Sequence, residues 1–181
     1  MVRQTRFVEG SVTGGANPKR LSAVSRGFGL IEVLVVVAVI AILATVAVPN
    51  FTTLIQDNRM SSQALDLLVA LRTAQSEARK SGSVSLCANS AGTDWRTGWV
   101  VLTGTNCTLD EGEREILTNG EQRGLSTLSA GVASVRFNRD GSTPNPSQFV
   151  FCDNRGAPKA KGVEVTESGL IRANNTGLVC G

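Results

Sequence analysis

The sequence has 181 residues but no histidine, no tyrosine, and only two tryptophans and six phenylalanines. Histidine is the usual general base of enzymes and the commonest metal ligand, so its absence argues against acid–base catalysis and against most metal sites. No glycine-rich phosphate loop occurs either. The composition therefore predicts a protein that is not an enzyme and that uses no cofactor and no metal ion.

The formal net charge of +3 is distributed unevenly along the chain. Residues 1–27 carry five basic side chains against the single acidic Glu9, whereas residues 28–181 carry 13 basic and 14 acidic side chains. The larger part therefore has a net charge of −1, which gives no general attraction to nucleic acid. Residues 1–27 also lack hydrophobic periodicity, so we expect disorder there.

A long apolar run follows this basic segment. From Phe28 to Val48 there are 21 residues with one charge, Glu32. As a helix that rises about 1.5 Å per residue, the run spans about 30 Å, enough to cross a bilayer. It is longer than the apolar core of a secretory signal peptide, and no small-residue cleavage site follows it.

A simple membrane anchor explains the length of the run but not the carboxylate of Glu32. A charged group within a membrane helix costs free energy and usually has a partner. No Lys, Arg or His lies between Phe28 and Arg59. The partner of Glu32 is therefore expected to come from another molecule or from a new chain terminus.

Gly27-Phe28 followed by Glu32 resembles the class III signal of type IV pilins and type II secretion pseudopilins. The resemblance implies that residues 1–27 are a leader, which a prepilin peptidase removes between Gly27 and Phe28, and that Phe28 is then N-methylated. It implies that residues 28–48 form a transmembrane and filament-core helix, in which Glu32 meets the N-terminal amine of a neighbouring subunit. Pro49 lies where pilins also have a proline.

The same resemblance implies a place in the bacterial inner membrane and then in a pilus or pseudopilus. The basic leader would hold the N-terminus in the cytoplasm, so residues 81–181 would lie in the periplasm. The implied partners are the major pilin, other minor pilins, the prepilin peptidase, the assembly platform of the inner membrane and the membrane lipid.

The helical pattern continues through residues 49–80, with a predicted bend at Pro49, which has no backbone N–H to donate. Residues 52–80 contain no Pro or Gly, and Ser81-Gly82 is a typical helix end. One apolar stripe is predicted to pack on the following domain. Its members recur at three- and four-residue spacing: Leu54, Ser61, Leu65, Leu68, Leu71, Ala74 and Ala78.

From residue 83 onward the pattern changes to short alternating stretches between turns, which predicts antiparallel strands. The predicted fold class is α+β, with one long helix packed on a mostly antiparallel β domain. The strands are expected at residues 84–87, 98–102, 114–117, 133–138, 148–152 and 162–166, with a weaker one at 169–172. Local stretches such as Trp95-Arg96-Thr97-Gly98-Trp99 and Phe149-Val150-Phe151-Cys152 resemble the GspH/FimT branch of pilin-like proteins. Both tryptophans are expected in the core.

Four cysteines all follow the apolar run, which suggests disulfides in an oxidising compartment. Three pairings can be drawn among them. We favour Cys87–Cys107 and Cys152–Cys180, because each joins neighbours in chain order. Zinc is disfavoured, since neither CxxC spacing nor histidine is present.

The sequence favours a structural subunit, a FimU-like minor pilin, over two alternatives: a type II secretion pseudopilin and a DNA-binding pilin for transformation. FimT proteins of the last class resemble one another at a Gly-Arg-x-Arg motif. Here the stretch is Gly169-Leu170-Ile171-Arg172, which keeps only the second arginine. A DNA contact, which we do not favour, would use basic residues in the C-terminal part: Arg155, Lys159, Lys161 and Arg172.

Overall fold

The computed structural model describes residues 28–90 and 92–180. One long helix, α1 (Leu30–Ser81), precedes all the strands. The strands that follow are β1 (Val84–Ala88), β2 (Trp99–Thr103), β3 (Glu115–Asn119), β4 (Thr127–Ser129), β5 (Ser134–Phe137), β6 (Ser147–Cys152), β7 (Lys161–Val165) and β8 (Ile171–Ala173). Two short 3-10 helices, η1 (Trp95–Thr97) and η2 (Ala157–Lys159), lie between strands. The chain divides into two compact units, the first ending at Leu43 and the second beginning at Ala44.

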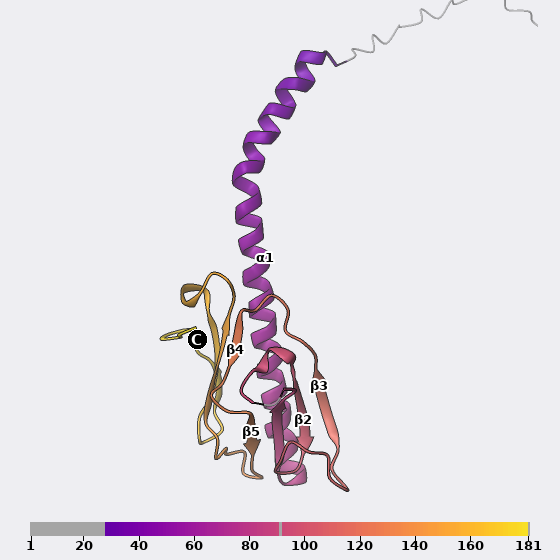
Figure 1. The fold of residues 1–181 in the computed structure, drawn as a ribbon, viewed down its shortest axis with the longest axis vertical. Coiled ribbons are helices and arrows are strands. Elements are labelled where there is room, and N and C mark those ends of the chain that lie inside the picture. Colours follow the sequence, from indigo (N-terminus) through magenta and orange to yellow (C-terminus); the bar gives the residue numbers. More distant parts are fainter. Residues whose placement is uncertain (1–27, 91, 181) are drawn as a thin grey trace, which may run out of the picture. The chain divides into compact units, whose positions relative to one another are not determined.

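Within the second unit the strands form two four-stranded sheets (Figure 1). Their orders are β3-β2-β1-β5 and β4-β6-β7-β8, and neighbouring strands in each are antiparallel. The structure confirms the α+β class, a long N-terminal helix with an antiparallel β domain. Strand β4 was not predicted, because its only apolar residue is Leu128 and the segment is three residues long.

The last strand begins later than the sequence pattern predicts. Gly169 has a φ of +79°, and its backbone N–H donates to the carbonyl of Thr166, so it forms a turn and β8 begins at Ile171. Left-handed φ values of this kind favour glycine. The Gly169-to-Arg172 stretch is therefore half turn and half strand.

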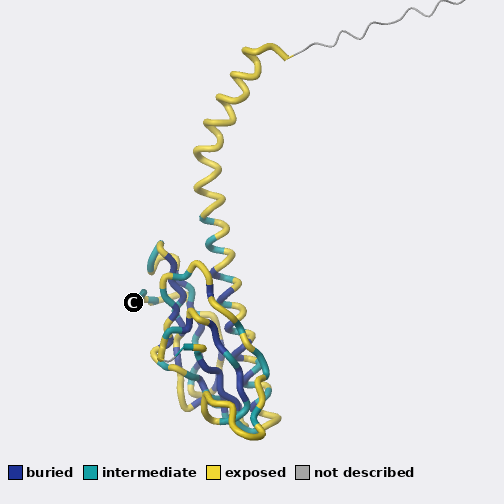
Figure 2. The backbone as a smooth tube through the Cα atoms, turned by 45° about the vertical axis from the view of Figure 1, so that its right-hand side comes forward, coloured by how far each residue is buried: buried dark blue, intermediate teal, exposed yellow. Residues whose placement is uncertain are grey.

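The core lies between the two sheets and the C-terminal half of α1, where Figure 2 shows the buried residues concentrated. Trp95 and Trp99 are fully buried, as expected from the sequence. Trp95 packs edge-to-face on Phe149 at 4.8 Å between ring centroids, and its indole N–H donates to the carbonyl of Val132. The indole N–H of Trp95 thus has a partner inside an aromatic core, whereas the buried indole N–H of Trp99 has none among the described residues.

The predicted stripe of α1 is wrong in its first half. Leu54 and Leu65 are more than half exposed, while Leu71, Ala74 and Ala78 are buried as expected. The face that packs on the domain consists of Met60, Gln63, Leu67, Ala70, Leu71, Ala74 and Ala78. Hydropathy does not indicate that Gln63 is buried, because its burial depends on a hydrogen bond from its side-chain amide to the carbonyl of Arg123.

Candidate assembly surfaces

The N-terminal part of α1 is an apolar helical segment whose residues are exposed. All residues from 28 to 52 are exposed, and the most apolar 18-residue window of α1 has a mean hydropathy of 3.0 with none of it buried. By length and composition this helix is able to cross a membrane. Its first turn is closed by the carbonyl of Gly29, which accepts hydrogen bonds from the backbone N–H groups of Glu32 and Val33.

Glu32 lies on the first turn of this helix. Its carboxylate forms no ion pair and no hydrogen bond with any other residue between 28 and 180 that the structure describes. The residues around it are apolar and exposed, such as Ile31 and Leu34. The predicted cleavage site includes Gly27, which lies outside the described residues together with the rest of the leader. Phe28, on the other side of that bond, is exposed.

Pro49 lies inside α1, and the helix is assigned without a break through it. Side chains near it bond to backbone carbonyls one turn back: the amide of Asn50 to Val46, and the hydroxyls of Thr52 and Thr53 to Val48 and Pro49. Side-chain bonds of this type, from a hydroxyl or amide to a carbonyl one turn back, often accompany a bend in a helix. The bend at Pro49 stays a prediction.

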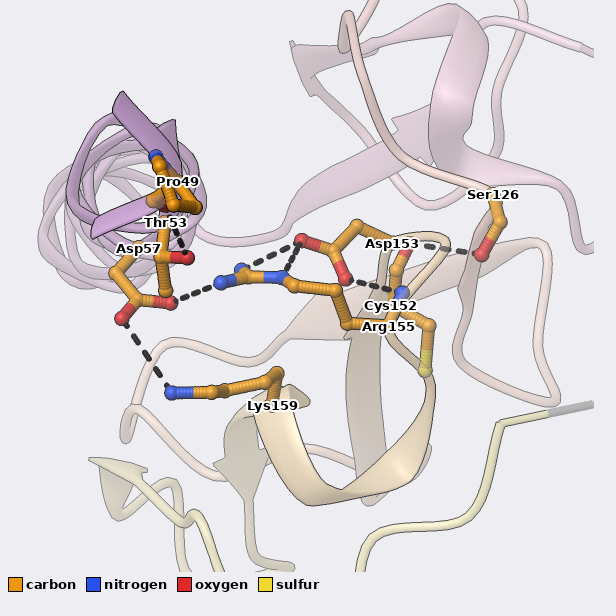
Figure 3. A network of polar contacts seen from close by, with 8 residues as sticks. All are labelled: Pro49, Thr53, Asp57, Ser126, Cys152, Asp153, Arg155 and Lys159. Carbon is orange, nitrogen blue, oxygen red and sulfur yellow. Dashed lines mark hydrogen bonds and ion pairs between the residues drawn. The ribbon is translucent and has the colours of Figure 1, made fainter. Parts of the chain in front are cut away.

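A polar network joins α1 to the segment after β6 (Figure 3). The guanidinium of Arg155 bonds to Asp57 of α1 at 2.7 Å and to Asp153 at 2.6 Å, and the amine of Lys159 lies 3.6 Å from the other oxygen of Asp57. Burial alone would raise the pKa of Asp153, but hydrogen bonds from the side chain and backbone of Arg155 outweigh it and hold that pKa below its ordinary value. Asp153 is therefore a buried anion that depends on Arg155.

This network occupies two of the four cations considered for DNA contact. A third, Arg172, pairs with Glu164 at 3.0 Å, so that of these four cations only Lys161 forms no ion pair with a described residue. Phosphate contacts need cations that can release their present partners. The structure thus brings Arg155 and Lys159 together, but around carboxylates of the chain itself.

Two disulfides hold the β domain. Cys87 of β1 is bonded to Cys107, and Cys152 of β6 is bonded to Cys180, which is the pairing favoured from chain order. No free cysteine is present in the described part of the chain. The second disulfide ties the C-terminal segment to a central strand.

Sequence reasoning missed the polar side chains that attach α1 to the domain. Besides Gln63 and Asp57, the amide of Gln75 donates to the carbonyls of Gly141 and Gly169. These partners are 60 to 98 residues apart in the chain, so local spacing contains no signal for them. The one signal in the sequence was the absence of Pro and Gly between residues 52 and 80. It predicted the helix that carries Asp57, Gln63 and Gln75.

Comparisons with known proteins agree with this geometry. Residues 23–48 match the family model of the prokaryotic N-terminal methylation motif, and residues 63–169 match that of type II transport protein GspH. A stretch of 56 residues is 48% identical to the type IV major pilin protein PilA of Myxococcus xanthus (strain DK1622). That match covers 31% of this chain and 25% of PilA, so the chain spans about a quarter of the length of this relative.

Among solved structures, two crystal forms of the type IV minor pilin FimU from Pseudomonas aeruginosa (strain PAO1) are similar. The form in space group P21 has a TM-score of 0.55 at 21% identity and covers 68% of this chain and 93% of FimU. The form in P65 has a TM-score of 0.52 at 20% identity and covers 66% and 96%. At this level of identity the likeness shows the fold.

An apolar helix with a methylation motif at its head, followed by an antiparallel β domain of the FimU fold, defines a type IV pilin-like protein. Because the GspH model matches more than half of the sequence, the chain belongs to the GspH family.

Proposed function

We propose that this chain is a minor type IV pilin, a structural subunit that primes or joins a pilus serving twitching motility and adhesion. The observation that carries the proposal is Glu32, a carboxylate without a partner among the described residues on an exposed apolar helix. A methylation motif covers that helix, and a FimU-like domain follows it. Family and fold are those of structural subunits, which fits the absence of histidine.

In this function the leader is removed after Gly27 in the inner membrane, and the new amine of Phe28 is methylated. The cation at that terminus gives Glu32 of an adjacent subunit its partner, because opposite charges attract strongly in an apolar environment. The β domain lies in the periplasm, where its disulfides persist. The partners are the major pilin, other minor pilins, the prepilin peptidase and the assembly platform.

A second candidate is a minor pseudopilin of a type II secretion system. It is favoured by the description of the family model, type II transport protein GspH. The N-terminal features serve both functions equally, so the phenotype of the organism that encodes the chain has to separate them. Loss of surface pili on deletion supports the first, whereas loss of secreted proteins with normal pili supports the second.

The test replaces the chromosomal copy by Gly27→Ala, Glu32→Ala or the control Val33→Ala. Gly27→Ala is expected to retain the leader, visible as a larger chain in mass spectrometry. Glu32→Ala is expected to be cleaved and methylated normally but to be absent from sheared pili. Val33→Ala removes apolar atoms one position away and keeps the carboxylate, so we expect it to be processed and incorporated.

Two results would contradict the proposal. Normal incorporation of Glu32→Ala would show that the carboxylate has no role in assembly. Equal loss of Glu32→Ala and Val33→Ala from pili would show that the helix is merely sensitive to any truncation there.

A further inference from the structure

The loop between β2 and β3 presents an exposed apolar residue among carboxylates. We call residues 109–113 the acidic turn: Leu109, Asp110, Glu111, Gly112 and Glu113. Leu109 is 59% exposed, and Asp110 and Glu111 beside it are exposed as well. No heavy atom of another segment lies within 4 Å of the position that a Cβ on Gly112 would occupy, so the turn projects from the domain.

The acidic turn is fixed in its conformation before any partner binds. The disulfide from Cys107 ties its base to β1, and the backbone N–H of Glu113 donates to the carbonyl of Asp110. The amide of Asn106 bonds to the Asp110 carboxylate at 2.9 Å. A surface that is already ordered loses little conformational entropy on association. An exposed leucine in a rigid acidic frame is suited to an apolar hollow bordered by cations.

A surface of that chemistry lies on the same chain beside Gly124 and Leu125. Two adjoining hollows of about 230 and 310 Å³ share these two residues, and we call them together the arginine cavity. Each is far larger than the ~30 Å³ of one water molecule. The buried Met60 and the half-buried Leu125 contribute apolar atoms to the lining, and Arg59 and Arg123 contribute charge.

Two of the three arginines that line the cavity form no ion pair in the part of the chain that the structure describes. Arg59 and Arg123 are exposed, and neither forms an ion pair within the described ranges 28–90 and 92–180. The other charges of the cavity lining are Arg96 bonded to Asp94, Asp153 bonded to Arg155, and the exposed Glu121. The cavity thus has one free positive charge in excess.

The acidic turn and the arginine cavity lie at opposite ends of β3. Leu102 pairs with Glu115, at the end that the acidic turn enters, and Trp99 pairs with Asn119, at the end from which the chain continues to Gly124. A contact between such unlike ends cannot close within one chain. Joined head to tail from one subunit to the next, such a heterologous contact closes into a ring or, where the rotation does not close, repeats into a filament.

We propose that the acidic turn of one subunit docks into the arginine cavity of a second copy of this chain. Leu109 enters the hollow between Met60 and Leu125, and Glu111 pairs with Arg59 and Arg123 at its rim. The inference rests on the proposed function as a filament subunit. It adds a specific contact between the β domains to the contacts of the N-terminal helices.

The test uses the full chain in cells that make pili, with the photoreactive residue p-benzoylphenylalanine in place of Leu109. Illumination is expected to join two copies of the chain, and mass spectrometry is expected to locate the adduct in residues 56–63 or 120–125. The control places the same residue at Leu170, which is similarly exposed on another turn and is expected to give no such adduct.

Charge reversal then tests the pairing itself. Glu111→Arg is expected to lower the adduct yield several-fold through repulsion by Arg123, and adding Arg123→Glu to the same chain is expected to restore it. Glu167→Arg, at an exposed site outside both surfaces, is the matched control and should leave the yield unchanged.

Two outcomes overturn the inference alone: a chain present in pili that gives no adduct, or an adduct that lies on a different pilin or elsewhere on this chain. Failure of Arg123→Glu to restore the yield also overturns the pairing. Absence of the unsubstituted chain from pili would overturn the proposed function and this inference with it.

Discussion

Arg155 lies between two carboxylates, 2.7 Å from Asp57 on α1 and 2.6 Å from Asp153 beside β6. Its side chain is mostly buried and spans 98 residues of sequence to reach the helix. The ion pair therefore fixes α1 to the β domain at the end of the domain nearer Pro49. An exposed ion pair contributes little to stability, whereas breaking a buried one leaves an unpaired buried charge and is strongly destabilising. The pair of Arg155 with the buried Asp153 therefore matters more to stability than its pair with the more exposed Asp57.

Arg155→Gln is expected to lower the free energy of unfolding by about 1–3 kcal/mol, because it leaves the buried carboxylate of Asp153 without its main donor. Thermal or urea unfolding of the full chain in detergent, with the disulfides intact, measures this. Arg139→Gln removes an exposed arginine that has no ion pair among the described residues, so it is expected to stay within about 0.5 kcal/mol of the unsubstituted protein. Equal effects of both substitutions would show that the network does not stabilise the fold.

Stability is expected to fall on acidification. Despite the opposing effect of burial, Arg155 holds the pKa of Asp153 below its ordinary value. A carboxyl group with a lowered pKa in the folded state stabilises the fold above its unfolded pKa, about 4, and this contribution is lost as the pH falls further, through the folded pKa. Unfolding measured from pH 7 to pH 2 should show this loss, and Asp153→Asn, which cannot titrate, should show a shallower loss. Parallel profiles would contradict the role of Asp153.

Gly169 is expected to tolerate no side chain. Its φ is +79°, and a Cβ there would overlap the carbonyl oxygen of Gly141 and meet the amide of Gln75. Gly169→Ala should therefore unfold the domain or lower its stability by more than the ~1–2 kcal/mol that a left-handed conformation costs a residue other than glycine. Gly177 has a similar φ of +68° with nothing within 4 Å, so Gly177→Ala isolates that backbone cost. The measurement compares the melting temperatures of the two variants. Gly169→Ala is expected to melt lower, and equal values would refute the steric argument.

The sequence predicted those parts of the fold that depend on local pattern. The apolar run, the absence of Pro and Gly between residues 52 and 80, and the alternation after residue 83 were sufficient for the helix and for most strands. The packed face of α1 was not predictable in its first half, because Gln63 is buried through a bond to a carbonyl 60 residues away. The leucine pattern instead followed Leu54 and Leu65, which remain exposed on the domain.

The candidate site was likewise predicted in part. Glu32 was identified because it is the one charge in a long apolar run. The disulfide pairing was favoured because each bond joins cysteines that are neighbours in chain order. Arg155 and Lys159 were weighed as free cations, since a sequence shows the charge of a residue but not its distance from Asp57. Electrostatic surfaces depend on tertiary contacts between distant segments, so they require the structure.

The disulfide between Cys152 and Cys180 closes a separation of 28 residues. Replacing both residues by serine is expected to lower the free energy of unfolding by about 3 kcal/mol, because the unfolded chain gains freedom when the loop is opened. Urea unfolding of the oxidised full chain tests this, with thiol labelling to verify that the remaining disulfide is intact. A loss below about 1 kcal/mol would show that the C-terminal segment is held by other contacts, such as that of Leu178 at Gly162.

DNA binding through the C-terminal basic residues is expected to be weak. Arg155, Lys159 and Arg172 would have to give up Asp57, Asp153 and Glu164 to bind phosphates, and this cost offsets the gain from counterion release. Retardation of duplex DNA by the full chain in detergent, at salt concentrations from about 50 to 200 mM, measures it. Lys161→Gln with Arg172→Gln should then change nothing. Tight, salt-sensitive binding that this pair abolishes would contradict the prediction and would favour a role in DNA uptake, since those two cations lie outside the network that attaches α1 to the domain.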